Sequence, residues 1–231
     1  LKKRHYAAAF VKEALLKNKD LLELDFLKFR SALEQQENGR FYAALATLQY
    51  YCSLRLSEAA AVYKEDFQFG SIPKDNRVVF SRSVKWDRYK ADKPYIEHNF
   101  KNSKKLGYKT AILHPQAKAY LESLVSAAPS GAIFQLKGAL LGYRQIGYRY
   151  DKAFMAAGLS FRGSHVLRHG SVREFFSQHG DLGIARQQLG NTSFKSTEIY
   201  AQPLQKSHDN FVLKQYEPLQ IAADSKDKKT S

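Results

Sequence analysis

The apolar residues of this chain change their spacing twice, and this change restricts the fold more than any other feature. Spacing of three or four residues, typical of helices, runs through 21–56, where we expect two helices separated near Gly39. Short β-type runs with polar loops between them replace it at 77–80, 95–98 and 108–113. Helical spacing returns after Pro115. The pattern predicts an α+β fold, mainly α-helical, with a small three-stranded antiparallel sheet.

Capping residues mark where several helices should begin. Arg55 comes just before Ser57, which we predict to be the N-cap of a short helix over 58–63. Arg55 should therefore lie at a helix junction. Other helices are predicted at 115–125 and 143–157 and after three further caps, Ser164, Asp181 and Ser196.

The charge of the chain points to a polyanionic partner. Its 37 Lys and Arg residues against 22 Asp and Glu give a net charge of +15, which favours nucleic acid over an anionic membrane. No apolar run approaches the roughly 20 residues that span a bilayer, and no signal peptide is evident, so we expect a cytoplasmic, DNA-associated protein. The lone Cys52 lies in an apolar helical stretch, where we predict a buried, inert thiol.

A basic segment follows the first predicted strand. Between positions 82 and 109 there are nine basic and three acidic residues. Trp86 and Tyr89 alternate with these charges, which suits a loop lying against a phosphate backbone. A solvated loop whose aromatic side chains hold it to the core explains the pattern equally well. Five basic residues of this segment are predicted to contact DNA: Lys85, Arg88, Lys90, Lys104 and Lys105.

Two histidines raise the question of a metal site. His165 and His169 are four residues apart and would share a helical face. Zinc proteases with this spacing carry Glu beside the first His, where this chain has Val166, so a metal site is disfavoured and no cofactor is expected.

Three segments together carry a resemblance that none carries alone. They read Leu-Arg-Leu-Ser-Glu at 54–58, His-Val-Leu-Arg-His at 165–169, and Leu-Gly-Asn at 189–191 followed by Ser-Thr-Glu-Ile-Tyr at 196–200. In order and spacing they resemble the signature boxes of the tyrosine recombinase, or phage integrase, family. The resemblance covers roughly residues 21–215 and implies that family's catalytic-domain fold.

The resemblance also implies roles for individual residues. Tyr200 would attack a scissile phosphodiester and leave a 3′-phosphotyrosyl link with a free 5′-hydroxyl, without ATP. Arg55 and Arg168 would hold the non-bridging oxygens of the phosphate, since a guanidinium donates two parallel hydrogen bonds. His165 would act as a general base or orient the phosphate.

Two further positions are assigned from the same resemblance. Lys101, in Phe-Lys-Asn before the third predicted strand, matches the family's general acid, with Lys104 and Lys105 as alternatives. Asn191 stands where the family has His or Trp. Its amide can still donate to a phosphate oxygen, but it lacks aromatic bulk and cannot ionise.

The resemblance, the net charge and the polar composition of the last residues together predict the domain organisation and the partners. We expect 1–20 to be a linker or a remnant of an N-terminal DNA-binding region, 21–218 to be the catalytic domain and 219–231 to be a disordered tail. Duplex DNA and a homo-oligomer, a tetramer on paired sites, are the expected partners. Two alternative functions stay open: relaxation of DNA in the manner of topoisomerase IB, and DNA binding by a catalytically weakened relative.

Overall fold

The computed structural model describes residues 21–86, 93–98, 108–160 and 163–179. Two adjacent helices open this part of the chain, α2 (Glu23–Glu34) and α3 (Gly39–Tyr51), as the apolar spacing predicted. Gly39 is the first residue of α3, and a Cβ there would lie 2.1 Å from the carbonyl oxygen of Leu33. Only glycine permits so close an approach between the end of α2 and the start of α3.

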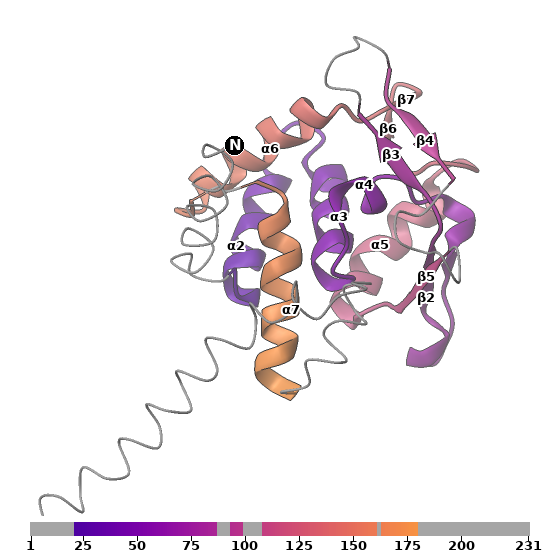
Figure 1. The fold of residues 1–231 in the computed structure, drawn as a ribbon, viewed down its shortest axis with the longest axis horizontal. Coiled ribbons are helices and arrows are strands. Elements are labelled where there is room, and N and C mark those ends of the chain that lie inside the picture. The colour runs from indigo at the N-terminus through magenta and orange to yellow at the C-terminus, as the bar shows by residue number, and fades with distance from the viewer. Residues whose placement is uncertain (1–20, 87–92, 99–107, 161–162, 180–231) are drawn as a thin grey trace, which may run out of the picture. The chain divides into compact units, whose positions relative to one another are not determined.

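Helix α3 is the centre of the core and lies between α2 and α5 (Pro115–Ala127) (Figure 1). Every residue from Tyr42 to Tyr50 is buried, because neighbouring elements cover α3 on all sides. Aromatic rings fill the contact with α2: Phe26 stacks on Tyr50 with ring centroids 4.1 Å apart. One turn further along α2, the ring centroid of Phe29 lies 4.2 Å from that of Phe154 of α6 (Tyr143–Ala156).

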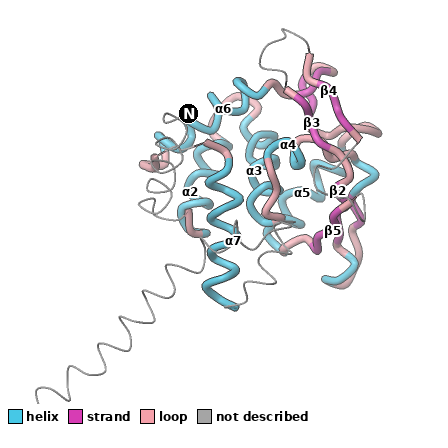
Figure 2. The backbone as a smooth tube through the Cα atoms, viewed as in Figure 1, coloured by secondary structure: helices cyan, strands magenta, loops and turns pink. Residues whose placement is uncertain are grey.

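The strands lie together on one side of the helices (Figure 2). Two antiparallel pairings join β1 (Phe67–Gln68), β2 (Arg77–Phe80) and β5 (Lys109–Ile112) into a three-stranded sheet in the order β1-β2-β5. Two shorter ladders pair β3 (Ser83–Lys85) with β4 (Tyr95–Glu97), and β6 (Gln135–Leu136) with β7 (Ala139–Leu140). Short 3-10 helices flank β1 and β2: η1 (Lys64–Asp66) and η2 (Pro73–Asp75).

The sheet has the predicted number of strands but not the predicted members. The run at 95–98 was expected to join the strands at 77–80 and 108–113, yet β4 pairs with β3 in a separate ladder. The third strand is β1, which is only two residues long. Such a strand carries no alternation of apolar and polar residues, so the sequence offered no periodic signal for it.

The remaining helices follow the predicted caps, with one correction. Helix α5 ends two residues beyond the predicted 125, α6 ends one residue before 157, and α7 (His165–His179) follows Ser164 as expected. The short helix α4 (Leu56–Ala59) begins after Arg55, so the prediction of Ser57 as its N-cap was wrong.

The chain divides into two units, residues 1–174 and 175–231. The site residues that the structure describes all belong to the first unit. The described part of the second unit is the end of α7, at 175–179. Helices predicted after Asp181 and Ser196 lie outside the described residues, as do the segments 1–20 and 219–231. Within the described ranges, none of the helices is long and apolar enough to cross a bilayer.

Candidate active site

Arg55 lies at the junction between α3 and α4, as the sequence predicted. The chain leaves α3 at Cys52, turns through Ser53 with φ of 52°, and reaches Arg55 in an extended conformation with φ of −67° and ψ of 148°. A positive φ is uncommon for a residue with a side chain and is retained only where surrounding contacts fix it. Here Ser53 is buried, and its Oγ lies 2.9 Å from Oγ of Ser171 on α7.

Glu58 connects the two arginines that the sequence singled out. Its carboxylate accepts from the Arg55 guanidinium at 2.7 Å and from the Arg55 backbone N–H at 2.9 Å. Nη1 of Arg168 lies 3.6 Å from the second carboxylate oxygen. The Glu58 side chain is only 5% exposed, and that of Arg168 only 6%. Both arginines therefore lie beside one buried negative charge.

The sequence offered one sign of this role for Glu58. A glutamate three residues after an N-cap commonly accepts from the N-cap backbone N–H, and Glu58 has this spacing from Arg55. With Ser57 taken as the cap, the signal was missed, and Glu58 was read only as part of the first box.

Helix α7 carries Arg168 and is attached to α3 at its first turn. The Gln49 side-chain amide donates to the carbonyl oxygen of Ser164 at 2.8 Å, and both residues are buried. Further along, Gly170 allows close contact, because a Cβ there would lie 2.3 Å from the carbonyl oxygen of Leu21. Tyr50 donates to the Glu174 carboxylate at 2.5 Å. These contacts fix the position of Arg168 relative to α3 and to the junction that carries Arg55.

His165 is the first residue of α7, and the charges of Arg55 and Arg168 act on its pKa. Packing on one side removes water from its otherwise exposed ring and lowers its pKa below the usual 6.5, and Arg168 and Arg55 lower it further. His169, whose ring centroid is 6.3 Å away, has its pKa lowered by burial, His165 and Arg168 to about 4. Both imidazoles are thus neutral near pH 7, which suits His165 to accept a proton.

We expect NMR titration of the free protein to give His165 a pKa below 6.5, because burial disfavours the charged imidazole and protonation adds a third cation beside two arginines. In Arg168→Gln the pKa of His165 should rise, since a repulsive charge is lost while Glu58 remains. Because a lowered pKa favours the neutral form in the folded state, the stability contributed by His165 is present above pH 6.5 and lost as pH falls through the folded pKa. Arg149→Gln, remote from the site, should leave the titration unchanged; equal shifts in both variants would contradict this origin.

Lys109 of β5 is a basic residue that the sequence did not assign to the site. Its Nζ donates at 3.1 Å to the carbonyl oxygen of Cys52, at the end of α3. Burial lowers the pKa of Lys109 to about 8, with Arg168 and Arg55 lowering it and Glu58 raising it. Cys52 is buried as predicted, and burial raises the pKa of its thiol to about 12.

Of the predicted DNA-contacting residues, the structure describes Lys85. It lies on β3, and its Nζ is 2.7 Å from the Glu97 carboxylate on β4. The neighbouring Trp86 packs against the core and donates to the carbonyl oxygen of Leu141 at 2.8 Å, so this aromatic side chain holds its segment to the core. The other predicted site residues lie outside the described residues: Tyr200, Lys101, Asn191, Lys104, Lys105, Arg88, Lys90 and, with them, Tyr89.

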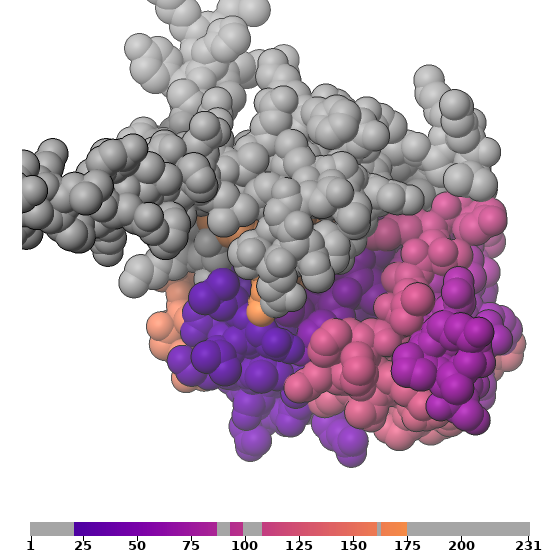
Figure 3. Space-filling view, turned by 90° about the horizontal axis from the view of Figure 1, so that it is seen from below, coloured from indigo at the N-terminus to yellow at the C-terminus, as the bar shows by residue number. Residues whose placement is uncertain are grey.

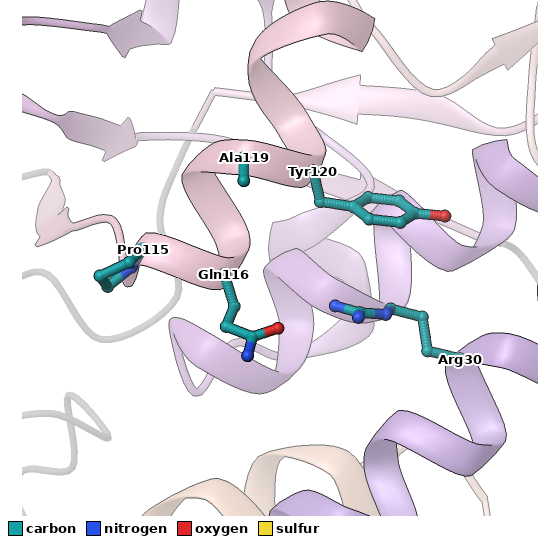
Figure 4. A pocket seen from close by; sticks show the side chains of 5 residues that line it. All are labelled: Arg30, Pro115, Gln116, Ala119 and Tyr120. Carbon is teal, nitrogen blue, oxygen red and sulfur yellow. The ribbon is translucent and has the colours of Figure 1, made fainter.

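An open pocket of about 390 Å³ lies between α2 and α5, whose surfaces adjoin in Figure 3. Figure 4 shows Arg30 of α2 extending toward Tyr120 of α5, and the guanidinium carbon lies 5.0 Å from the Tyr120 ring centroid. The pocket contains none of the predicted catalytic residues. Among the residues that the structure describes, no three His, Cys, Asp or Glu side chains form a metal-binding group.

Comparison with solved structures identifies the fold. The XerH site-specific recombinase bound to its difH substrate matches 83% of this chain with a TM-score of 0.59 and 17% identity. The chain has the catalytic-domain fold of tyrosine recombinases. This fold was expected from the three boxes, and the comparison confirms it. No protein-family model matches the sequence, and no curated protein matches it.

Two other structures with the tyrosine recombinase fold give the same result. The catalytic domain of bacteriophage HP1 integrase matches 80% of this chain and 88% of its own, with a TM-score of 0.53 and 16% identity. The Tn1549 transposon integrase in complex with transposon right end DNA matches 75% of this chain and 58% of its own, with a TM-score of 0.60 and 12% identity. The chain spans about half of the XerH chain, 52%.

Replacing Glu58 tests how much its buried carboxylate stabilises this arrangement. We expect Glu58→Gln to lower the free energy of unfolding by roughly 2–3 kcal/mol, because it leaves two guanidinium groups without their shared counter-charge. This loss is smaller than the roughly 3–5 kcal/mol usual when one partner of a buried ion pair is removed, since Arg55 is 30% exposed and reaches solvent. Urea denaturation measures it. Glu97→Gln breaks the exposed pair with Lys85 and should cost less than about 1 kcal/mol; equal losses in the two variants would refute the assigned role of Glu58.

Proposed function

We propose that the chain is a site-specific DNA recombinase that cleaves and rejoins DNA through a 3′-phosphotyrosyl intermediate. One observation carries this proposal: Arg55 and Arg168, from segments far apart in the sequence, pair with the same buried Glu58 carboxylate. A domain with the tyrosine recombinase fold thus holds two guanidinium groups of fixed charge beside one another. Two such groups suit a phosphodiester, whose two non-bridging oxygens each accept from a guanidinium.

The proposed reaction exchanges one phosphodiester for another. The phenolic oxygen of Tyr200 attacks the phosphorus, the bond to the 5′-oxygen breaks, and that oxygen receives a proton from Lys101. The proton of Tyr200 passes to His165 or to solvent. Negative charge builds on the non-bridging oxygens in the transition state, where Arg55 and Arg168 stabilise it. Attack by a 5′-hydroxyl on the phosphotyrosine reverses the step and rejoins the strand.

The proposed partner is duplex DNA. The net charge of +15 supports this, and binding should weaken steeply with salt because phosphate contacts dominate. We further propose that residues 21–218 form the catalytic domain, that Lys85, Arg88, Lys90, Lys104 and Lys105 contribute phosphate contacts, and that copies of the chain assemble on paired sites, as a tetramer. XerH and the Tn1549 integrase were each solved bound to DNA, which supports DNA as the partner.

A trapped intermediate tests the proposal. The chain is incubated with a nicked duplex that carries a target site, so that the short cleaved strand diffuses away and religation is prevented. A protein band shifted by covalently attached DNA on a denaturing gel is the expected result. Absence of this band, at a site that the chain binds in a gel-shift assay, would overturn the proposed activity.

Asn191 supports a second proposal, that the chain is a catalytically weakened relative that mainly binds DNA. An Asn amide can donate to a phosphate oxygen but lacks the bulk of His or Trp, so Tyr200 would be positioned less firmly. In that case Asn191→His should raise the yield of trapped adduct, whereas an unchanged yield would argue against it. Relaxation of supercoiled DNA that lacks paired sites would indicate instead a topoisomerase IB-like activity.

A further inference from the structure

Lys109 connects the three-stranded sheet to the segment that ends at Arg55. It is the first residue of β5, where it pairs with Phe80 of β2. Its Nζ donates to the carbonyl oxygen of Cys52, the C-cap residue of α3. Carbonyl groups at a helix C-terminus carry partial negative charge, so an ammonium group there is a favourable partner.

The turn from Cys52 to Arg55 is held from two directions. From β5, Lys109 contacts the carbonyl oxygen of Cys52 at 3.1 Å. From α7, Ser171 contacts the hydroxyl of Ser53 at 2.9 Å. The positive φ of Ser53 means that this turn depends on its neighbours to keep its conformation. Loss of either contact should therefore displace Arg55, three residues beyond Cys52.

We infer that Lys109 is a positioning residue of the candidate active site: its ammonium group holds the Cys52–Arg55 turn and thereby fixes Arg55 beside Arg168. The proposed reaction gives Lys109 no step of its own, so its role concerns the position of Arg55. Its effect on DNA cleavage rests on the proposed function, whereas its effect on the turn does not.

The charge of Lys109 should change within an accessible pH range. Among the described residues, the groups that face it are Arg55 at the N-cap of α4, Glu58 of α4, Arg168 of α7 and Cys52 at the end of α3. Burial is the largest cause of its pKa of about 8. Above that pH the neutral amine donates a weaker hydrogen bond to the Cys52 carbonyl. The turn should thus be held firmly below about pH 8 and more loosely above it, while a bound phosphate, being negative, raises the pKa and extends the firm range.

The first measurement uses the full chain without DNA. Backbone amide resonances of Ser53, Leu54 and Arg55 are followed by NMR from about pH 7 to about pH 9.5, a range that brackets the shifted pKa. In the wild type they should follow one titration. In Lys109→Arg, whose charge is fixed, that titration should disappear. Amides that do not titrate in the wild type, or that titrate alike in Lys109→Arg, would overturn the inference.

Lys64 provides a matched control. Its Nζ donates to the carbonyl oxygens of Ser126 and Ala128 at the end of α5, at 3.0 and 2.7 Å, so it also binds a helix C-terminus through an ammonium group. Lys64→Met should leave the amides of the Cys52–Arg55 turn on their wild-type titration. A change in Lys64→Met equal to that in Lys109→Met would show a general loss of stability rather than positioning, and would overturn the inference.

The second measurement is the rate of adduct formation on the nicked duplex. Because displacement of a catalytic group by about 1 Å can cost a hundredfold, we expect Lys109→Met to be at least about tenfold slower than the wild type at pH 7. Lys109→Arg should stay within about threefold and lose the decline at alkaline pH. A folded Lys109→Met variant that forms the adduct at the wild-type rate would overturn the positioning role of Lys109.

The two measurements separate this inference from the proposed function. Amides that titrate as expected, in a chain that forms no adduct, would retain the positioning role and reject the recombinase activity. An active chain in which the amides of the turn do not respond to Lys109 would retain the recombinase activity and reject the positioning role. If Lys109→Met does not fold, the wild type and Lys109→Arg still give both the amide titration and the rate profile.

Discussion

Tyr200→Phe is expected to abolish the covalent adduct between the chain and a nicked duplex, while DNA binding stays close to that of the wild type. Phenylalanine keeps the aromatic ring and removes only the hydroxyl, so the nucleophile is lost with little change in shape or charge. Phenylalanine has no oxygen that could attack the phosphorus in place of the phenolic oxygen. The measurement compares adduct bands on a denaturing gel with binding curves for the same duplex.

Tyr148→Phe is the matched control for Tyr200→Phe. Tyr148 lies on α6 and is 56% exposed, so losing its hydroxyl should disturb the fold little. We expect its adduct yield to equal that of the wild type. An adduct that persists in Tyr200→Phe and is lost when another tyrosine is replaced would reassign the nucleophile.

Arg168→Lys is expected to lower the rate of adduct formation by about 10²–10³-fold, which is the usual cost of removing one donor from a site that stabilises developing negative charge. Lysine keeps the charge beside Glu58 but cannot form the two parallel hydrogen bonds that a guanidinium offers to a phosphate. The Arg168 side chain is 6% exposed and lies within a packed region. The packing therefore prevents the shorter lysine side chain from shifting toward the phosphate. Single-turnover cleavage at saturating protein measures the effect.

Arg149→Lys controls for the loss of a guanidinium elsewhere on the domain. Arg149 pairs with Glu37 at 2.9 Å, and it belongs to α6 rather than to the candidate active site. Its cleavage rate should remain within about twofold of the wild type, because lysine keeps the positive charge and none of the proposed catalytic residues contacts Arg149 in the described residues. If the Arg168 variant cleaves as fast as the Arg149 variant, Arg168 does not contact the phosphate in the transition state.

Local sequence signals account for most helix positions in the described residues. Gly39 marked the boundary between α2 and α3, and Ser164 marked the start of α7, because capping and close backbone approach depend on one residue and its neighbours. The sheet was less predictable. Strands of two to four residues carry little periodic signal, and the partner that β4 selects depends on tertiary packing.

The three boxes of the sequence indicated a set of residues expected to act together, and apolar spacing indicated a mainly helical fold, since both are properties of short segments. Only the tertiary structure brought Arg55 and Arg168 to one Glu58 carboxylate, and Lys109 to the end of α3. The contact between Ser53 and Ser171 joins residues 118 positions apart. Such contacts arise when helices pack against a common core, and no local pattern in the chain records which side chains will then meet.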